Sequence, residues 1–227
     1  MYARGHGVPK DDAEAVRRYR RAAEQGNRDA QLNLGHVYAH GWGVPKDEAA
    51  AARWYRLAAE QGEDYARICL AEMYVEGRGV PHDDAEAVQC LWLAAESFDQ
   101  HVRSLALFYL GNMYADGRGV SKDDARAERK LRHAAKQGND MAQLALGQMY
   151  EVGRGVPQDD AEAIRWYRLA AKQGHPDAQR NWGVMYADGR GEPERADYVQ
   201  LAAEVRSLKG WMIVALVAWL LWGMLIE

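Results

Sequence analysis

The stretch Ala142–Gly174, AQLALGQMYEVGRGVPQDDAEAIRWYRLAAKQG, decides the fold because the chain carries related copies of it along its length. In each copy a tyrosine stands three residues before a Gly-x-Gly element, and in the first five copies an Ala-Ala pair follows that tyrosine by 20 residues. The tyrosines are 36 residues apart, except for 40 residues between the third and the fourth: Tyr2, Tyr38, Tyr74, Tyr114, Tyr150 and Tyr186. Such a period predicts a solenoid of stacked supersecondary units.

Each copy is expected to form two helices joined by the Gly-x-Gly element. In the second copy Asp29–His40 has apolar residues at helical spacing: Ala30, Leu34, Val37 and Tyr38. The glycines and the following proline stop this helix, and Asp47 is placed to cap a second one, which ends at Gly62. Paired acids such as Asp83-Asp84 and Asp159-Asp160 are interpreted as N-caps in other copies. The repeat unit is therefore a helix hairpin, which buries its apolar face only by stacking.

The combined pattern, A-x-x-x-L-G-x-M-Y-x-x-G-x-G-V-x-x-D…W-Y-x-x-A-A-x-x-G, resembles the Sel1-like repeat, a relative of the tetratricopeptide repeat. The resemblance covers about residues 1–205. It implies an all-α, right-handed α-solenoid of about five to six helix hairpins, whose first helices line a concave surface. It also implies an adaptor or scaffold rather than an enzyme, although some secreted, cysteine-rich members of the family are linked to penicillin binding.

Two departures from the pattern set the expected domain organisation. The chain begins inside a unit, so the first repeat of the solenoid, residues 1–205, is incomplete. The junction Ser97–Arg103 has four extra residues and lacks the capping glycine, and we expect it to change the angle between neighbouring hairpins. Residues 206–227 form a separate hydrophobic segment.

Composition excludes several classes of protein. With 48% hydrophobic and 27% charged residues the chain is neither disordered nor a polytopic membrane protein. A formal net charge of −4 excludes a dedicated nucleic-acid binder, so nucleic acid is not an expected partner. Two cysteines exclude a disulfide-rich scaffold and a four-cysteine zinc site. Cys69 and Cys90 fall in one unit, and two free thiols or an isolated disulfide both fit that placement.

No motif in the sequence calls for catalysis, a metal ion or a cofactor. His36 and His40 lie four residues apart, a spacing that can bind zinc, but no third ligand is evident nearby. The Gly-x-Gly elements precede no G-K-[ST], so they are interpreted as hairpin turns rather than phosphate loops. The serine motifs S-x-x-K and G-x-S-x-G do not occur.

The exposed strip of the first helices is the candidate partner-binding surface. Counting the repeat tyrosine as position zero, we expect positions −8, −4, −1 and 0 to be buried and positions −5 and −2 to face away. The outward positions are Asn33, His36, Cys69, Glu72, Tyr109, Asn112, Ala145, Gln148, Asn181 and Val184. The predicted partner-binding residues are Asn33, His36, Glu72, Tyr109, Asn112, Gln148 and Asn181. Side-chain amides can pair with an extended peptide, so the strip predicts a protein partner; an ordinary solvated face is the alternative.

The segment Gly210–Ile226, GWMIVALVAWLLWGMLI, contains no charged residue. As a helix it would be about 26 Å long, just short of a hydrocarbon core of about 30 Å. Its tryptophans, which suit a membrane interface, are Trp211, Trp219 and Trp222. We predict a single-pass anchor with membrane lipid as a second partner; a helix docked on the solenoid is the alternative.

The basic residues that flank this span set its expected topology. Arg206 and Lys209 precede it, and positive flanks favour the cytoplasmic side. We therefore expect a cytoplasmic solenoid; a periplasmic or exported one is the alternative, because a signal peptide could precede residue 1.

These features predict a non-enzymatic scaffold or adaptor that tethers a protein partner, through a peptide segment or a membrane-complex subunit, to a membrane. A second hypothesis is an accessory subunit of a larger membrane protein complex, whose tail helix packs among other subunits. A third, suggested by the resemblance alone, is a penicillin-binding or β-lactamase-like enzyme, against which the missing serine motifs argue.

Overall fold

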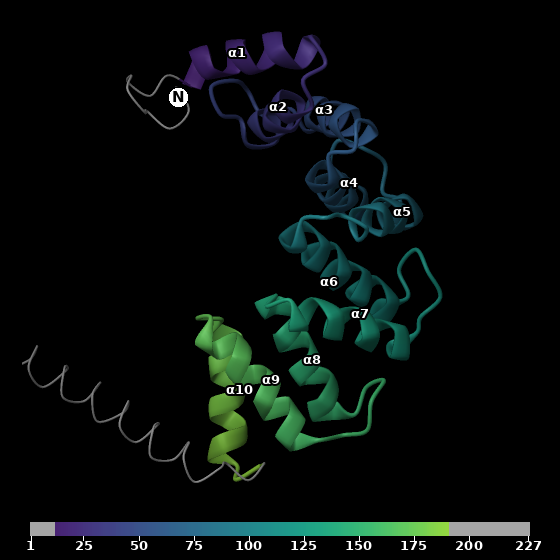
Figure 1. The fold of residues 1–227 in the computed structure, drawn as a ribbon, viewed down its shortest axis with the longest axis vertical. Coiled ribbons are helices and arrows are strands. Elements are labelled where there is room, and N and C mark those ends of the chain that lie inside the picture. The colour runs from purple at the N-terminus through teal and green to yellow at the C-terminus, as the bar shows by residue number, and fades with distance from the viewer. Residues whose placement is uncertain (1–11, 191–227) are drawn as a thin grey trace, which may run out of the picture.

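The computed structural model describes residues 12–190, which form a crescent of α-helices without a strand (Figure 1). In chain order the helices are α1 (Asp12–Glu24), α2 (Arg28–His40), α3 (Glu48–Glu60), α4 (Asp64–Glu76), α5 (Asp84–Ala94), α6 (Gln100–Asp116), α7 (Asp124–Lys136), α8 (Asp140–Val152), α9 (Asp160–Lys172) and α10 (Pro176–Ala187). Each helix packs chiefly on its neighbours in the chain, and α4 also touches α6. The predicted all-α stack of hairpins is therefore confirmed for this part of the chain. The start of the first repeat and the hydrophobic tail lie outside the described residues.

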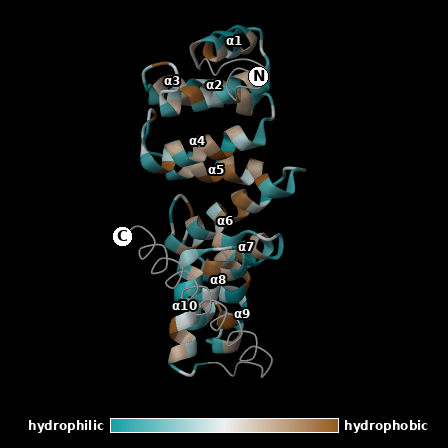
Figure 2. Cartoon of the chain, turned by 90° about the vertical axis from the view of Figure 1, so that its left-hand side faces the viewer, coloured by the Kyte–Doolittle hydropathy of each residue, from teal (hydrophilic) through white to brown (hydrophobic). Residues whose placement is uncertain are grey.

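The hydrophobic core is divided along the stack. One cluster, with Leu34 and Val37, joins α1 to α2, whereas another, with Tyr167 and Met185, joins α9 to α10. Figure 2 shows apolar residues on helices throughout the crescent. One predicted core residue, Tyr38, is only half-buried, because its hydroxyl reaches the surface and accepts a hydrogen bond from Arg20 Nη2 at 2.6 Å. Units of this kind contact only adjacent units, which is the defining property of a solenoid.

Aspartates and glycines set the helix boundaries as the sequence predicted. Asp47 caps α3 by accepting a hydrogen bond from the backbone N–H of Ala50 at 2.8 Å. Asp83, Asp123 and Asp159 cap α5, α7 and α9 in the same way. The first helices α2, α4, α6 and α8 each end at a glycine in the left-handed conformation.

Small residues on the first helix make room for large ones on the second. At Gly147 of α8, a methyl group would lie within 3.0 Å of the ring of Tyr167, which is fully buried on α9. Gly35 and Gly111 give the same room to Tyr55 and Leu131. Hairpin packing therefore depends on these small–large pairs, because a close-packed interior tolerates little added volume.

The four extra residues before the fourth unit lengthen a helix rather than a loop. Helix α6 has 17 residues, against 13 in α4 and α8. Asp99 caps it by accepting hydrogen bonds from the N–H groups of His101 and Val102. Phe98 stands where the other units have the capping glycine, and the Oγ of the neighbouring Ser97 accepts a hydrogen bond from the Asp99 N–H at 3.2 Å. The expected change of angle at this junction stays a prediction.

In three hairpins an arginine of the Gly-x-Gly loop binds the preceding hairpin. Arg118 donates to both carboxylate oxygens of Asp84, at 2.7 and 3.1 Å, and to the carbonyl oxygen of Val75 at 3.1 Å. Arg154 and Arg190 make equivalent pairs with Asp124 and Asp160. The paired acids thus divide their roles, and the interpretation of both as caps is wrong: the first acid caps the helix and the second binds the next loop.

Candidate partner-binding groove

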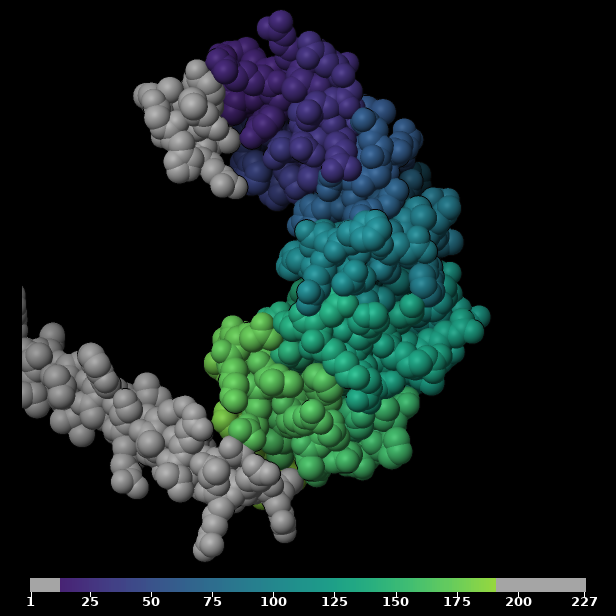
Figure 3. Space-filling view, in the orientation of Figure 1, coloured from purple at the N-terminus to yellow at the C-terminus, as the bar shows by residue number. Residues whose placement is uncertain are grey.

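Two adjacent cavities open among the first helices of the hairpins. The larger, of about 470 Å³, lies among α6, α8 and α10, and the smaller, of about 420 Å³, lies between α4 and α6. Asn112 and Asp116 line both cavities, so the two cavities adjoin each other. Helices α4 and α6 lie toward the hollow side of the crescent (Figure 1), which the space-filling view shows as a concave surface (Figure 3). We call the two cavities together the groove.

Five of the seven predicted partner-binding residues line the groove. Asn112, Gln148 and Asn181 line the larger cavity, and Glu72 and Tyr109 line the smaller one together with Asn112. They come from four different first helices, so the repeat itself brings them together. The structure fixes where these residues lie, and their role in binding stays a prediction.

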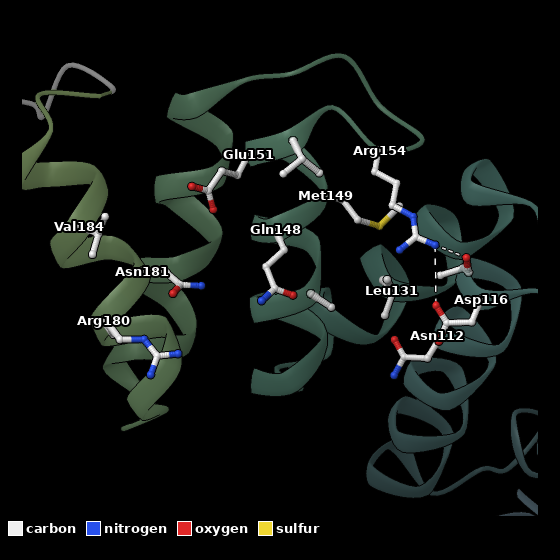
Figure 4. Close-up of a pocket in the computed structure, with 13 residues that line it drawn as sticks. Asn112, Asp116, Leu131, Gln148, Met149, Glu151, Arg154, Arg180, Asn181 and Val184 are labelled. Carbon is white, nitrogen blue, oxygen red and sulfur yellow. Dashed lines mark hydrogen bonds and ion pairs between the residues drawn. The ribbon is translucent and has the colours of Figure 1, made fainter.

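Two of the three amides of the larger cavity are free to bind. In the described part of the chain, the side chains of Asn112 and Gln148 make no hydrogen bond. Asn181 reaches the hydroxyl of Tyr167, and Figure 4 shows it pointing toward Gln148 across the cavity. An amide offers a donor and an acceptor side by side, which matches the alternating N–H and C=O groups of an extended chain.

Most charged residues of the larger cavity have partners elsewhere in the protein. Arg154 donates to Asp124 at 2.7 Å. Glu151 accepts hydrogen bonds from Arg190 at 2.9 Å and from the Tyr167 hydroxyl at 2.6 Å. Burial and this carboxylate both raise the pKa of Tyr167, so its hydroxyl stays a donor at neutral pH. The cavity therefore presents neutral amides beside an apolar surface, to which Val152, 69% exposed, and Val184, 53% exposed, contribute.

Two predicted residues, Asn33 and His36, line neither cavity. Asn33 donates to the carbonyl oxygen of Asp29 at 2.7 Å. The ring of His36 is hydrogen-bonded through Nδ1 to the Tyr55 hydroxyl at 2.8 Å, and burial lowers its pKa. His40 Nδ1 lies 2.9 Å from the His36 carbonyl oxygen, so both rings have protein partners. Within residues 12–190, no group of three or more His, Cys, Asp or Glu residues could hold a metal ion.

The prediction that Cys69 belongs to the exposed strip is wrong, because this residue is buried. Its side chain is 9% exposed and packs in the cluster between α3 and α4. Burial raises its pKa to about 12, which makes the thiol a poor nucleophile at neutral pH. Cys69 and Cys90 are both free thiols in this structure.

The sequence prediction missed the part of the groove that lies one helical turn further on. Asp116 and Val152 stand four residues after Asn112 and Gln148, on the same helix face. Extending the strip by one turn would have found both residues. Helix periodicity could not have found Arg154, because this residue comes from a loop and reaches back to the preceding hairpin.

The structure does not test the membrane prediction. Within residues 12–190 no helix is both long and apolar enough to cross a bilayer. Gly210–Ile226, with Trp211, Trp219 and Trp222, lies outside the described residues.

A family model described as Sel1 repeat matches the chain six times, at residues 1–27, 28–63, 65–97, 104–139, 140–175 and 176–204. The gap between the third and the fourth match falls on the insertion. The matches include parts of the chain that the structure does not describe.

Solved structures agree with this match. A Sel1 repeat protein from Oxalobacter formigenes is 37% identical, with a TM-score of 0.78, over 92% of this chain and 84% of that one. A protective antigen present in uropathogenic Escherichia coli strains, displaying an SLR fold, is 38% identical with a TM-score of 0.75. That match covers 83% of this chain and 39% of the antigen, so this chain spans well under half of its length. No curated protein sequence matches significantly.

Proposed function

This chain belongs to the Sel1 repeat family, and from that premise we propose that its groove binds an extended segment of a partner protein. Sel1 repeat proteins are generally protein-interaction scaffolds that bind other proteins. A scaffold of this kind needs a continuous surface that crosses several repeats, and the groove crosses four first helices, α4, α6, α8 and α10.

The observation that carries the proposal is the pair of unpartnered amides in the groove. Asn112 and Gln148 occupy the same repeat position, 36 residues apart, and neither has a hydrogen-bond partner in the described part of the chain. A polar group without a partner gains most from a ligand that supplies one. An extended peptide presents backbone N–H and C=O groups to consecutive repeats of a solenoid.

Removing both amides should weaken partner binding on the order of tenfold or more, because two hydrogen-bonding groups of the peptide would lose their partners. The variant is Asn112→Leu with Gln148→Met, which keeps side-chain size. Partners captured by the 227-residue chain from native membranes are identified by mass spectrometry, and their affinities for both proteins are then measured.

The control is Gln89→Met with Gln100→Leu, which replaces two exposed amides by apolar side chains outside the groove. Its thermal unfolding and that of the test variant should stay near the parent value, because none of the replaced side chains is buried and substitutions outside the core usually cost less than about 0.5 kcal/mol. Equal affinity of the test variant and the parent chain would move the binding site away from the groove.

We also propose that Gly210–Ile226 tethers the scaffold to a membrane, with the solenoid on the cytoplasmic side. The support is the uncharged sequence of the segment and the preceding Arg206 and Lys209. The chain should resist carbonate extraction from membranes, and protease added to intact spheroplasts should spare the solenoid. Release by carbonate would remove the anchor, whereas digestion from outside would reverse the topology. Stoichiometric membrane subunits in the detergent-purified material would favour the accessory-subunit alternative.

A further inference from the structure

The smaller cavity of the groove has apolar walls and an acidic rim. Ala71, Val75 and Met113 contribute apolar surface between α4 and α6. Glu72 and Asp116 contribute carboxylates, and Asn112 contributes an amide that has no hydrogen-bond partner in the described part of the chain. An apolar cavity with charge near its mouth suits a long side chain that ends in the opposite charge.

The cations near this cavity are already engaged. Arg118 donates to both oxygens of Asp84 and to the carbonyl oxygen of Val75. Arg154 is the nearest cation to Asp116, at 3.8 Å, but its shorter ion pair, at 2.7 Å, is with Asp124.

The two carboxylates of the rim are therefore undercompensated. Glu72 forms no ion pair within residues 12–190; its partner is the Tyr109 hydroxyl, which donates a hydrogen bond to Glu72 Oε1. The Asp116 side chain is 58% exposed. Two carboxylates of this kind beside an apolar cavity leave a net negative charge for a ligand to meet.

Both carboxylates lie near the C-terminal ends of helices. Glu72 and Val75 lie in the last turn and a half of α4, which ends at Glu76, and Asp116 is the last residue of α6. The C-terminal end of a helix carries a partial negative charge, and here Arg118 and Arg154 donate to the carbonyl oxygens of Val75 and Ala115. The negative charge that is left for a ligand is therefore mainly that of the two carboxylates.

We infer that the cavity between α4 and α6 binds a lysine or arginine side chain of the partner segment, whose cationic end meets the carboxylates of Glu72 and Asp116. This inference rests on the proposed function and names the chemistry of the partner. The aliphatic stem of the basic side chain lies against Ala71, Val75 and Met113, and its charge stays at the rim. Tyr109 supplies an aromatic ring beside the cation.

The larger cavity adds a second, apolar requirement. Val152 and Val184 expose apolar surface there, in the units that follow α6. An extended chain that crosses consecutive first helices meets the two cavities in order. The partner segment therefore has an apolar residue on one side of its basic residue.

Selection from a phage-displayed library of random dodecapeptides tests this inference on the 227-residue chain in mild detergent. The parent chain should enrich peptides with lysine or arginine at one fixed position. The variant Glu72→Gln with Asp116→Asn removes both charges, and the introduced glutamine amide still offers the Tyr109 hydroxyl an acceptor. This variant should lose the basic preference and bind the enriched basic peptides on the order of tenfold more weakly.

A charge-matched control separates the cavity from the net charge of the chain. Glu24→Gln with Glu60→Gln removes the same two charges from exposed positions at the ends of α1 and α3, and it should keep the basic preference. Equal thermal unfolding of both variants excludes a folding defect.

Each result of the selection has a defined meaning. Enriched peptides without a basic position, whose binding needs Asn112 and Gln148, would overturn this inference and leave the proposed function standing. A basic preference that survives Glu72→Gln with Asp116→Asn would also overturn it. Failure of the parent chain to enrich any peptide would count against both proposals.

Discussion

Replacing Gly119 with alanine should lower the free energy of unfolding by roughly 2–5 kcal/mol, a large loss for a single change to a loop. Two costs add at this position. Gly119 has a φ of +65°, a left-handed conformation that costs a residue with a Cβ about 1–2 kcal/mol. A methyl group there would also lie within 3.0 Å of the carbonyl oxygen of Asp84, so the loop could no longer dock on the start of α5.

Gly138→Ala separates the two costs. Gly138 has a φ of +92°, and a methyl group there would meet nothing within 4 Å. This control should lose only about 1–2 kcal/mol. Urea unfolding followed by circular dichroism gives both values, and limited proteolysis should cut the Gly119→Ala variant in the loop between α6 and α7. Equal losses in the two variants would mean that the close approach to Asp84 contributes nothing.

Local features of the chain were predictable because local chemistry fixes them. Asp47 and Gly62 mark the ends of α3 by capping and left-handed backbone geometry, and both lie within a few residues of the groups they satisfy. The insertion was visible as a longer spacing, but its effect was not. Whether four residues extend a loop or a helix depends on the Asp99 cap, and the structure shows that they extend α6.

The repeat period predicted the hairpins but not the contacts between them. Arg118 pairs with Asp84, which is 34 residues earlier, and no spacing rule for a single helix predicts such a pair. Burial of Cys69 is similar, since it depends on the packing of α3 against α4 rather than on its own helix face. In the groove, five residues predicted from the outward face lie together, whereas His36 turns to Tyr55 across the hairpin.

The second large expected effect concerns the packing of Tyr167 on α9 against Gly147 on α8. Tyr167→Leu should lose about 3 kcal/mol, because it leaves a void in a fully buried site and removes the hydrogen bond to Glu151. Gly147→Ala should lose about 1–3 kcal/mol, because its methyl group would lie within 3.0 Å of the Tyr167 ring. Gly183→Ala is the control: a methyl group there would meet nothing within 4 Å, so helix propensity should stabilise this variant slightly.

Combining Tyr167→Leu with Gly147→Ala should restore part of the stability that each single change removes. The third hairpin already uses this combination, since Ala71 and Leu91 are both buried in one cluster at the positions equivalent to Gly147 and Tyr167. The new methyl group would fill part of the void that leucine leaves, so the double variant should be more stable than additivity predicts by about 1–3 kcal/mol. A double-mutant cycle in urea measures this coupling. Strict additivity would contradict the pairing, because it would mean that the two positions do not share one packing site.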